Sequence, residues 1–124
     1  MASRVALVNA FYEQLFTFMD QLKDMYPDDP DFPLGIMTLK MVKSGNPIFV
    51  VKTFYESSKG YEDQILSKNE HFFLDHDFAD FGEDMDFNIL SKLKQYVKTM
   101  GATSKDNVWL YVQALYKLAR AISA

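Results

Sequence analysis

SKDNVWLYVQALYKLARAIS, residues 104–123, is the segment around which the predicted architecture is built. It holds no charged side chain from Val108 to Tyr116. One apolar face recurs at alternating spacings of four and three residues, as on an α-helix, and comprises Val108, Val112, Leu115, Ala119 and Ile122. Trp109, Tyr111, Tyr116 and Leu118 widen that face. A helix that is apolar over so much of its surface needs neighbours on several sides, so we expect a buried C-terminal helix in an all-α domain.

The length and composition indicate a single helical domain over residues 1–124. A chain of this length can bury a core without disulfides, and the absence of cysteine removes thiol nucleophiles and thiolate metal sites. The formal net charge of −4 gives no help to binding of nucleic acid or anionic lipid. No apolar run approaches the roughly 20 residues that span a bilayer, and the N-terminus is a poor signal peptide. We therefore expect a soluble cytoplasmic protein that does not bind membranes.

The other helices follow from apolar periodicity and from breaks rich in proline and glycine. Helices are expected over about residues 4–25, 33–43, 47–57 and 88–100, the last capped by Asp86 or Asn88, with a softer segment at 58–66 and one helical turn capped by Asn69. The domain is then a bundle of five or six helices. Within residues 33–43, the inward positions should be Ile36, Leu39 and either Met41 or Val42.

Cap residues predict where two of these helices meet and where the last one begins. Gly45 suits a left-handed helix end, Asn46 an N-cap and Pro47 the first position of the next helix. The pattern Thr103-x-x-Asp106 resembles a capping box at the start of the C-terminal helix.

Two segments are compatible with more than one structure. The first helix, capped by Ser3, could face the core or form a dimerising coiled coil, and its repeat of only about three heptads favours the core. The β-branched run at residues 48–51 could be a strand. A helix is favoured there because the caps agree and no second strand-like run exists to pair with it.

The segment DHDFADFGEDMDF, residues 75–87, combines six acidic residues with three phenylalanines and no lysine or arginine. An EF-hand loop starting at Asp75 would need glycine at its sixth position and glutamate at its twelfth, and these positions hold Asp80 and Asp86. The EF-hand pattern therefore fails. A solvated acidic loop is favoured. The alternative is a divalent-metal-responsive module that uses residues 75–86, with Asp75, Asp77 and Asp80 as candidate ligands.

No constellation in the sequence specifies catalysis. There is no Gly-x-Ser-x-Gly turn and no phosphate-cradling glycine loop. His71 and His76 are five residues apart, which does not align two ligands on one helix face. We expect a protein that is not an enzyme and that uses no cofactor.

Three lysines near the predicted helix at 88–100 suggest a further functional hypothesis, nucleic-acid binding. Lys92, Lys94 and Lys98 could make the chain a weak nucleic-acid binder, with Tyr96 stacking on a base. The acidic segment before these lysines argues against nucleic acid, and a solvated helix face is favoured.

The aromatic content points to protein contacts. The chain has 11 phenylalanines and 7 tyrosines, more than a small interior is expected to hold. Exposed apolar patches mark interfaces, and aromatic residues are enriched in interface cores. The interaction candidates are Phe54, Tyr55, Phe78 and Phe81, and an entirely core role for them is equally open. The leading hypothesis is a non-enzymatic protein–protein interaction or structural accessory module that binds a protein partner or itself as a homodimer.

Three segments together resemble a known group of proteins. They are FYEQLFTFMDQLKDMYPDDPDF (residues 11–32), SGNPIFVVKTF (44–54) and NVWLYVQALYKLA (107–119). The combination resembles small helical proteins of unassigned function that are encoded by large double-stranded DNA viruses of algae and protists. The resemblance covers most of the chain and includes no catalytic motif. It implies a cytoplasmic or virion setting in an infected cell and a partner that is a viral or host protein.

Overall fold

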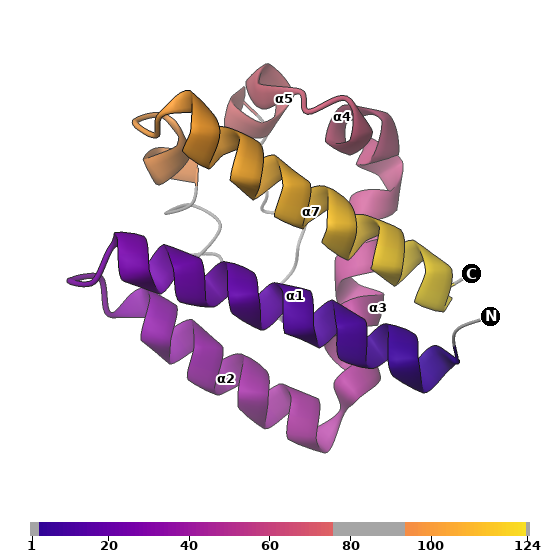
Figure 1. Ribbon diagram of the computed structural model, residues 1–124. Coiled ribbons are helices and arrows are strands. Elements are labelled where there is room, and N and C mark those ends of the chain that lie inside the picture. The colour runs from indigo at the N-terminus through magenta and orange to yellow at the C-terminus, as the bar shows by residue number, and fades with distance from the viewer. Residues whose placement is uncertain (1–2, 76–93, 124) are drawn as a thin grey trace.

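The computed structural model describes residues 3–75 and 94–123, with the side chains of residues 73–75 left out (Figure 1). Every regular element in these residues is helical, which confirms the predicted all-α fold. The elements are α1 (Arg4–Met25), α2 (Asp31–Gly45), α3 (Pro47–Ser58), the 3₁₀-helix η1 (Lys59–Tyr61), α4 (Glu62–Leu66), α5 (Glu70–Asp75) and α7 (Ala102–Ser123). Residues 94–97 are also helical, whereas the start of the helix predicted over 88–100 lies outside the described residues.

α7 is the centre of the helical packing, as the sequence predicts. It runs antiparallel to α1, and α3 crosses behind both helices (Figure 1). The short helix α4 also contacts α7. α2 packs against α1 and α3 and lies at the edge of the bundle (Figure 1). This edge position leaves one side of α2 without a neighbouring helix among the described elements.

The aromatic side chains that the structure describes are buried or half-buried. Phe11, Tyr12, Phe32 and Tyr116 are almost completely inaccessible to solvent. The ring of Phe11 meets that of Tyr12 edge to face at 5.7 Å, and the Tyr12 hydroxyl donates a hydrogen bond of 2.6 Å to the Pro47 carbonyl. No phenylalanine or tyrosine side chain described by the structure lies mainly in solvent. The large exposed apolar side chains in this part of the chain are instead valine, leucine and methionine.

The turn between α1 and α2 is tied to residues 94–97. The rings of Tyr26 and Tyr96 stack with centroids 3.7 Å apart, and Phe32 lies beside both. The buried carboxyl of Asp29 accepts hydrogen bonds from the Tyr96 hydroxyl and from the backbone N–H of Asp31. This cluster of aromatic rings around a carboxyl fastens two segments that are about 70 residues apart in the chain.

The predicted left-handed end at Gly45 is wrong. Gly45 is the last residue of α2 and does not have the positive φ of a left-handed residue. The break comes from Asn46, with φ −154° and ψ 81°, because the residue before a proline is driven out of the helical region. Asn46 takes the N-cap position without a side-chain cap hydrogen bond, and Pro47 is the first residue of α3, as predicted.

The predicted capping box is also wrong. α7 begins at Ala102, so Thr103 and Asp106 both lie inside the helix. The carbonyl of Gly101 accepts the first helical hydrogen bond, from the N–H of Lys105. Gly101 therefore takes the N-cap position, where glycine is well tolerated.

Two other predicted caps are confirmed. The Ser3 hydroxyl accepts from the N–H of Ala6 at 3.1 Å, and Asn69 Oδ1 accepts from the N–H of Phe72 at 3.0 Å. Between α4 and Asn69, Lys68 adopts a left-handed backbone with φ 55°. The N–H groups of Lys68 and Asn69 return to carbonyls of α4, which forms the helix end at which glycine is usually found.

Candidate protein-interaction surface

α2 has two apolar sides, and only one of them is covered. Phe32, Gly35 and Ile36 are buried against the bundle. Leu39 and Val42 are half-buried against the same core. Of the two alternatives for the last inward position, Val42 is therefore correct.

The uncovered side of α2 carries Leu34, Met37 and Met41, which we call the outer face. Their exposed fractions are 51%, 55% and 70%. They recur at spacings of three and four residues, so they form one stripe along the helix. Leu34 and Met41 are two turns apart, which gives the outer face a length of about 10 Å between their Cα atoms. Their spacing and exposure make a compact apolar strip on the side of α2 that faces away from the bundle.

Lys40 and Lys43 lie on the side of α2 toward α1. Lys40 is adjacent to Met37 of the outer face, whereas Lys43 follows Met41 by two residues and thus projects from the opposite side of the helix. The Lys43 ammonium lies 5.3 Å from the ring centroid of Tyr12 and 5.9 Å from that of Phe16. The Lys40 ammonium lies 6.0 Å from the same Phe16 centroid. Both amines are therefore held over rings of α1 by cation–π attraction. Of the two, only Lys40 lies next to the outer face.

No carboxylate of the described residues lies within 4 Å of the Lys40 or the Lys43 amine. The ion pairs within 4 Å in this part of the chain are Lys59–Glu56, Lys68–Asp106, Lys105–Glu70 and Arg120–Glu62. Lys40 and Lys43 belong to none of them.

A second polar cluster joins α4 to α7. One carboxylate oxygen of Glu62 accepts hydrogen bonds from the Tyr116 hydroxyl and from the Arg120 guanidinium. The Arg120 hydrogen bond, followed by that from Tyr116, lowers the pKa of Glu62. Burial and then the Glu62 carboxylate raise the pKa of Tyr116 to about 12. Tyr116 therefore stays protonated at neutral pH and donates to Glu62, so the cluster links α4 to α7.

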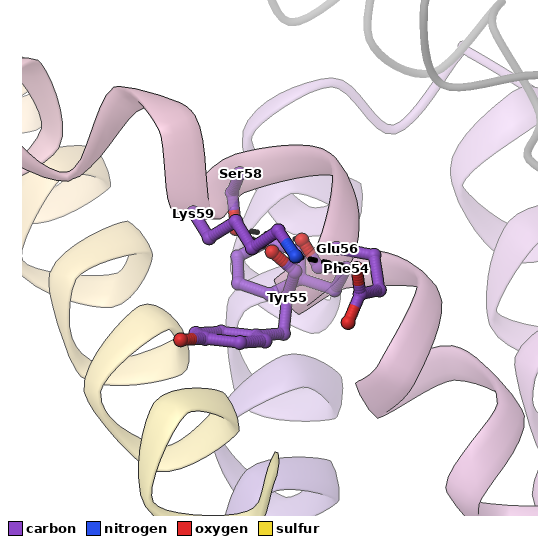
Figure 2. Close-up of polar contacts among 5 residues, drawn as sticks. All are labelled: Phe54, Tyr55, Glu56, Ser58 and Lys59. Atoms are coloured by element: carbon purple, nitrogen blue, oxygen red, sulfur yellow. Dashed lines mark hydrogen bonds and ion pairs between the residues drawn. The ribbon is translucent and has the colours of Figure 1, made fainter. Parts of the chain in front are cut away.

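The interaction candidates on α3 face the bundle. The Phe54 ring meets Phe11 at 5.8 Å, and the Tyr55 ring stacks on Tyr116 at 6.1 Å. Figure 2 shows both residues at the end of α3, where the Ser58 hydroxyl donates to the Phe54 carbonyl at 2.6 Å. Both rings are half-buried and pack against the core. They therefore offer less apolar surface than the outer face of α2.

A shallow hollow of about 250 Å³ lies between α1 and α7. It is lined by Gln14, Gln21, Asn107, Leu110 and Tyr111. Its lining holds no carboxylate, imidazole, thiol or amine. The Gln21 amide already donates to the Tyr111 hydroxyl at 2.7 Å. The hollow therefore presents no acid–base pair for chemistry.

Several predicted site residues fall outside the part of the chain that is described. They are Asp77, Phe78, Asp80, Phe81 and Lys92, together with the side chain of Asp75. Of the two remaining lysines, Lys94 is half-buried and Lys98 is exposed. Residues 3–75 and 94–123 contain no group of three or more acidic or histidine side chains placed to hold a metal ion. Metal binding by residues 75–86 and nucleic-acid binding by the lysines stay predictions.

None of the described helices is both long enough and apolar enough to cross a membrane. Comparisons with protein-family models, with curated proteins and with solved structures find no significant match. The resemblance to viral helical proteins stays a prediction.

Sequence reasoning missed the outer face, although a signal for it was present. Leu34, Met37 and Met41 have helical spacing, but so do Phe32, Ile36 and Leu39 on the opposite side. A short helix that is apolar on both sides does not show which side is covered. The position of α2 at the edge of the bundle determines which of its two apolar sides is covered.

Proposed function

We propose that this chain is a non-enzymatic protein–protein interaction module and that the outer face of α2 is its docking surface. The observation that carries the proposal is the exposure of Leu34, Met37 and Met41 in one stripe on a helix whose other side is covered. Isolated exposed apolar residues are ordinary, but an ordered strip of them is typical of binding sites.

The chemistry of the outer face fits a helical partner. An amphipathic helix docks through apolar side chains spaced by three, four and seven residues, which is the spacing of the outer face itself. Methionine suits such a surface because its unbranched, polarisable side chain adapts to the contour of a partner. Two of the three outer-face residues are methionines. The surface therefore favours packing against another helix.

The proposal is tested with a labelled synthetic helical peptide that carries a leucine stripe flanked by glutamines. The double variant Met37→Gln, Met41→Gln removes about 2 kcal/mol of apolar contact, so it should bind about 30-fold more weakly than the wild type. Fluorescence anisotropy measures the affinity, and circular dichroism confirms that the variant is folded.

The matched control is the double variant Val5→Gln, Leu110→Gln. These side chains are 70% and 55% exposed on α1 and α7, so the control removes similar apolar surface away from α2. It should bind the peptide like the wild type. Equal loss in both double variants, or no binding by the wild type, would contradict the proposal.

A further inference from the structure

We infer that Met37 and Met41 are a paired oxidation site, and that conversion of their thioethers to sulfoxides switches off docking at the outer face. The reagent is a two-electron oxidant of the peroxide class. The switching half of this inference rests on the proposed function, because it concerns how binding at the outer face is regulated. The oxidation half concerns the free protein and is measured without a partner.

Solvent exposure divides the methionines that the structure describes into two classes. Met19 and Met100 are only 4% and 9% exposed, because they pack in the core. Met37 and Met41 are mainly exposed, and Met25 at the end of α1 is 44% exposed. A thioether reacts when a dissolved oxidant reaches its sulfur atom, so the outer-face methionines should react before the two core methionines.

The two reactive side chains are neighbours on α2. Met37 and Met41 are four residues apart in the helix, so their side chains lie next to each other along the outer face. They supply two of its three apolar side chains, and Leu34 supplies the third. Leucine has no sulfur atom for a peroxide to oxidise. One type of reaction therefore changes most of the apolar strip.

The oxidation step transfers one oxygen atom from hydrogen peroxide to each sulfur. A sulfur lone pair attacks the peroxide, the O–O bond breaks, an S–O bond forms, and water leaves after a proton moves to the departing oxygen. The sulfur loses two electrons and the peroxide gains them. The product is a polar, chiral sulfoxide in place of a flexible apolar thioether. Burial of that oxygen against apolar side chains without a hydrogen bond costs free energy, so docking weakens.

The switch leaves the fold intact, because Met37 and Met41 lie on the uncovered side of α2. Its covered side is formed by Phe32, Gly35 and Ile36, none of which contains sulfur. Two methionine sulfoxide reductases, one for each sulfur epimer, return sulfoxides to thioethers. A dithiol supplies the two electrons and becomes a disulfide, and the oxygen leaves as water. The change at the outer face is therefore reversible.

The experiment treats the folded protein with limiting hydrogen peroxide and follows each methionine by peptide mass spectrometry. Met37 and Met41 should be converted while Met19 and Met100 stay reduced. The oxidised protein should bind the leucine-stripe peptide about 10-fold more weakly than the untreated protein, as measured by fluorescence anisotropy. Both reductases with dithiothreitol should restore the affinity, and the circular dichroism spectrum should stay unchanged throughout.

Two variants locate the effect. Met37→Leu, Met41→Leu keeps the apolar volume, so it should bind like the untreated wild type and be insensitive to peroxide although every other methionine is present. Met25→Leu should lose affinity on oxidation as the wild type does. Equal oxidation of the outer-face and core methionines, or an oxidised wild type that binds as tightly as before, would overturn the inference. Failure of the untreated wild type to bind would contradict the proposed function, and the switch with it.

Discussion

At the scale of single residues, the link between α4 and α7 depends on the charge of Glu62. The Arg120 guanidinium and the Tyr116 hydroxyl both donate to its carboxylate and hold its pKa below the ordinary value of 4.5. A depressed pKa means that the folded state favours the ionised form. The stabilisation is present above pH 4.5 and is lost as the pH falls through the folded-state pKa.

Glu62→Gln should therefore lower stability at pH 7 and have a smaller effect as the pH falls from 5 to 3. The measurement is the urea midpoint of the variant and the wild type at each pH. In an Arg120→Gln background, the pH-dependent part of the difference should shrink, because the Arg120 hydrogen bond is the largest cause of the lowered Glu62 pKa. A destabilisation of constant size across this range would contradict the assignment.

The Tyr96 hydroxyl ties residues 94–97 to the buried carboxyl of Asp29. Tyr96→Phe keeps the ring that stacks on Tyr26 and removes the donor. A hydrogen bond contributes about 0.5–1.5 kcal/mol to stability, so the free energy of unfolding should fall by at least that amount when the donor to a buried carboxyl is removed. Tyr26→Phe is the ring-preserving control and should have a smaller effect. Equal losses in the two variants would mean that the Asp29 hydrogen bond contributes little.

At the scale of the helical element, the end of α2 is set by the residue before the proline. Gly45 lies in a helical conformation, and a Cβ added to it would have no atom within 4 Å. Gly45→Ala should therefore stabilise the protein by about 0.4–1 kcal/mol, because it reduces the conformational freedom of the unfolded chain. Thermal unfolding measures the gain. A left-handed Gly45 would instead give a loss.

The single tryptophan lies at a less protected position of α7 than the sequence suggests. Its apolar surroundings in the sequence are compatible with a core ring, but Trp109 is only half-buried. Trp109→Ala should therefore cost less than the about 3–5 kcal/mol that is typical of a buried aromatic ring. Phe11→Ala, at a ring that is 1% exposed, should cost the full amount. Chemical denaturation of both variants measures the difference, and equal costs would contradict it.

At the scale of the whole molecule, the fold follows from the sequence more fully than the docking surface does. The period of apolar residues predicts α1 and α7 because each has one dominant apolar stripe, whereas α3 is predicted from its caps and from the lack of a strand to pair with residues 48–51. Two helix ends are harder to predict, because neither uses a side-chain cap. Asn46 leaves the helical region because a proline follows it, and Gly101 begins α7 only through its backbone carbonyl. The outer face of α2 depends on which helices surround it, and a single sequence does not specify this when both sides are apolar.

The antiparallel pairing of α1 and α7 also governs how the molecule would respond to force. The first residue of α1 and the last residue of α7 lie at the same end of this helix pair (Figure 1). A pull applied to the two termini would load the contacts between α1 and α7 one turn after another, as in opening a zipper, rather than all at once in shear. The pair that contributes the most packing at rest would therefore be the first to separate under tension, at low force.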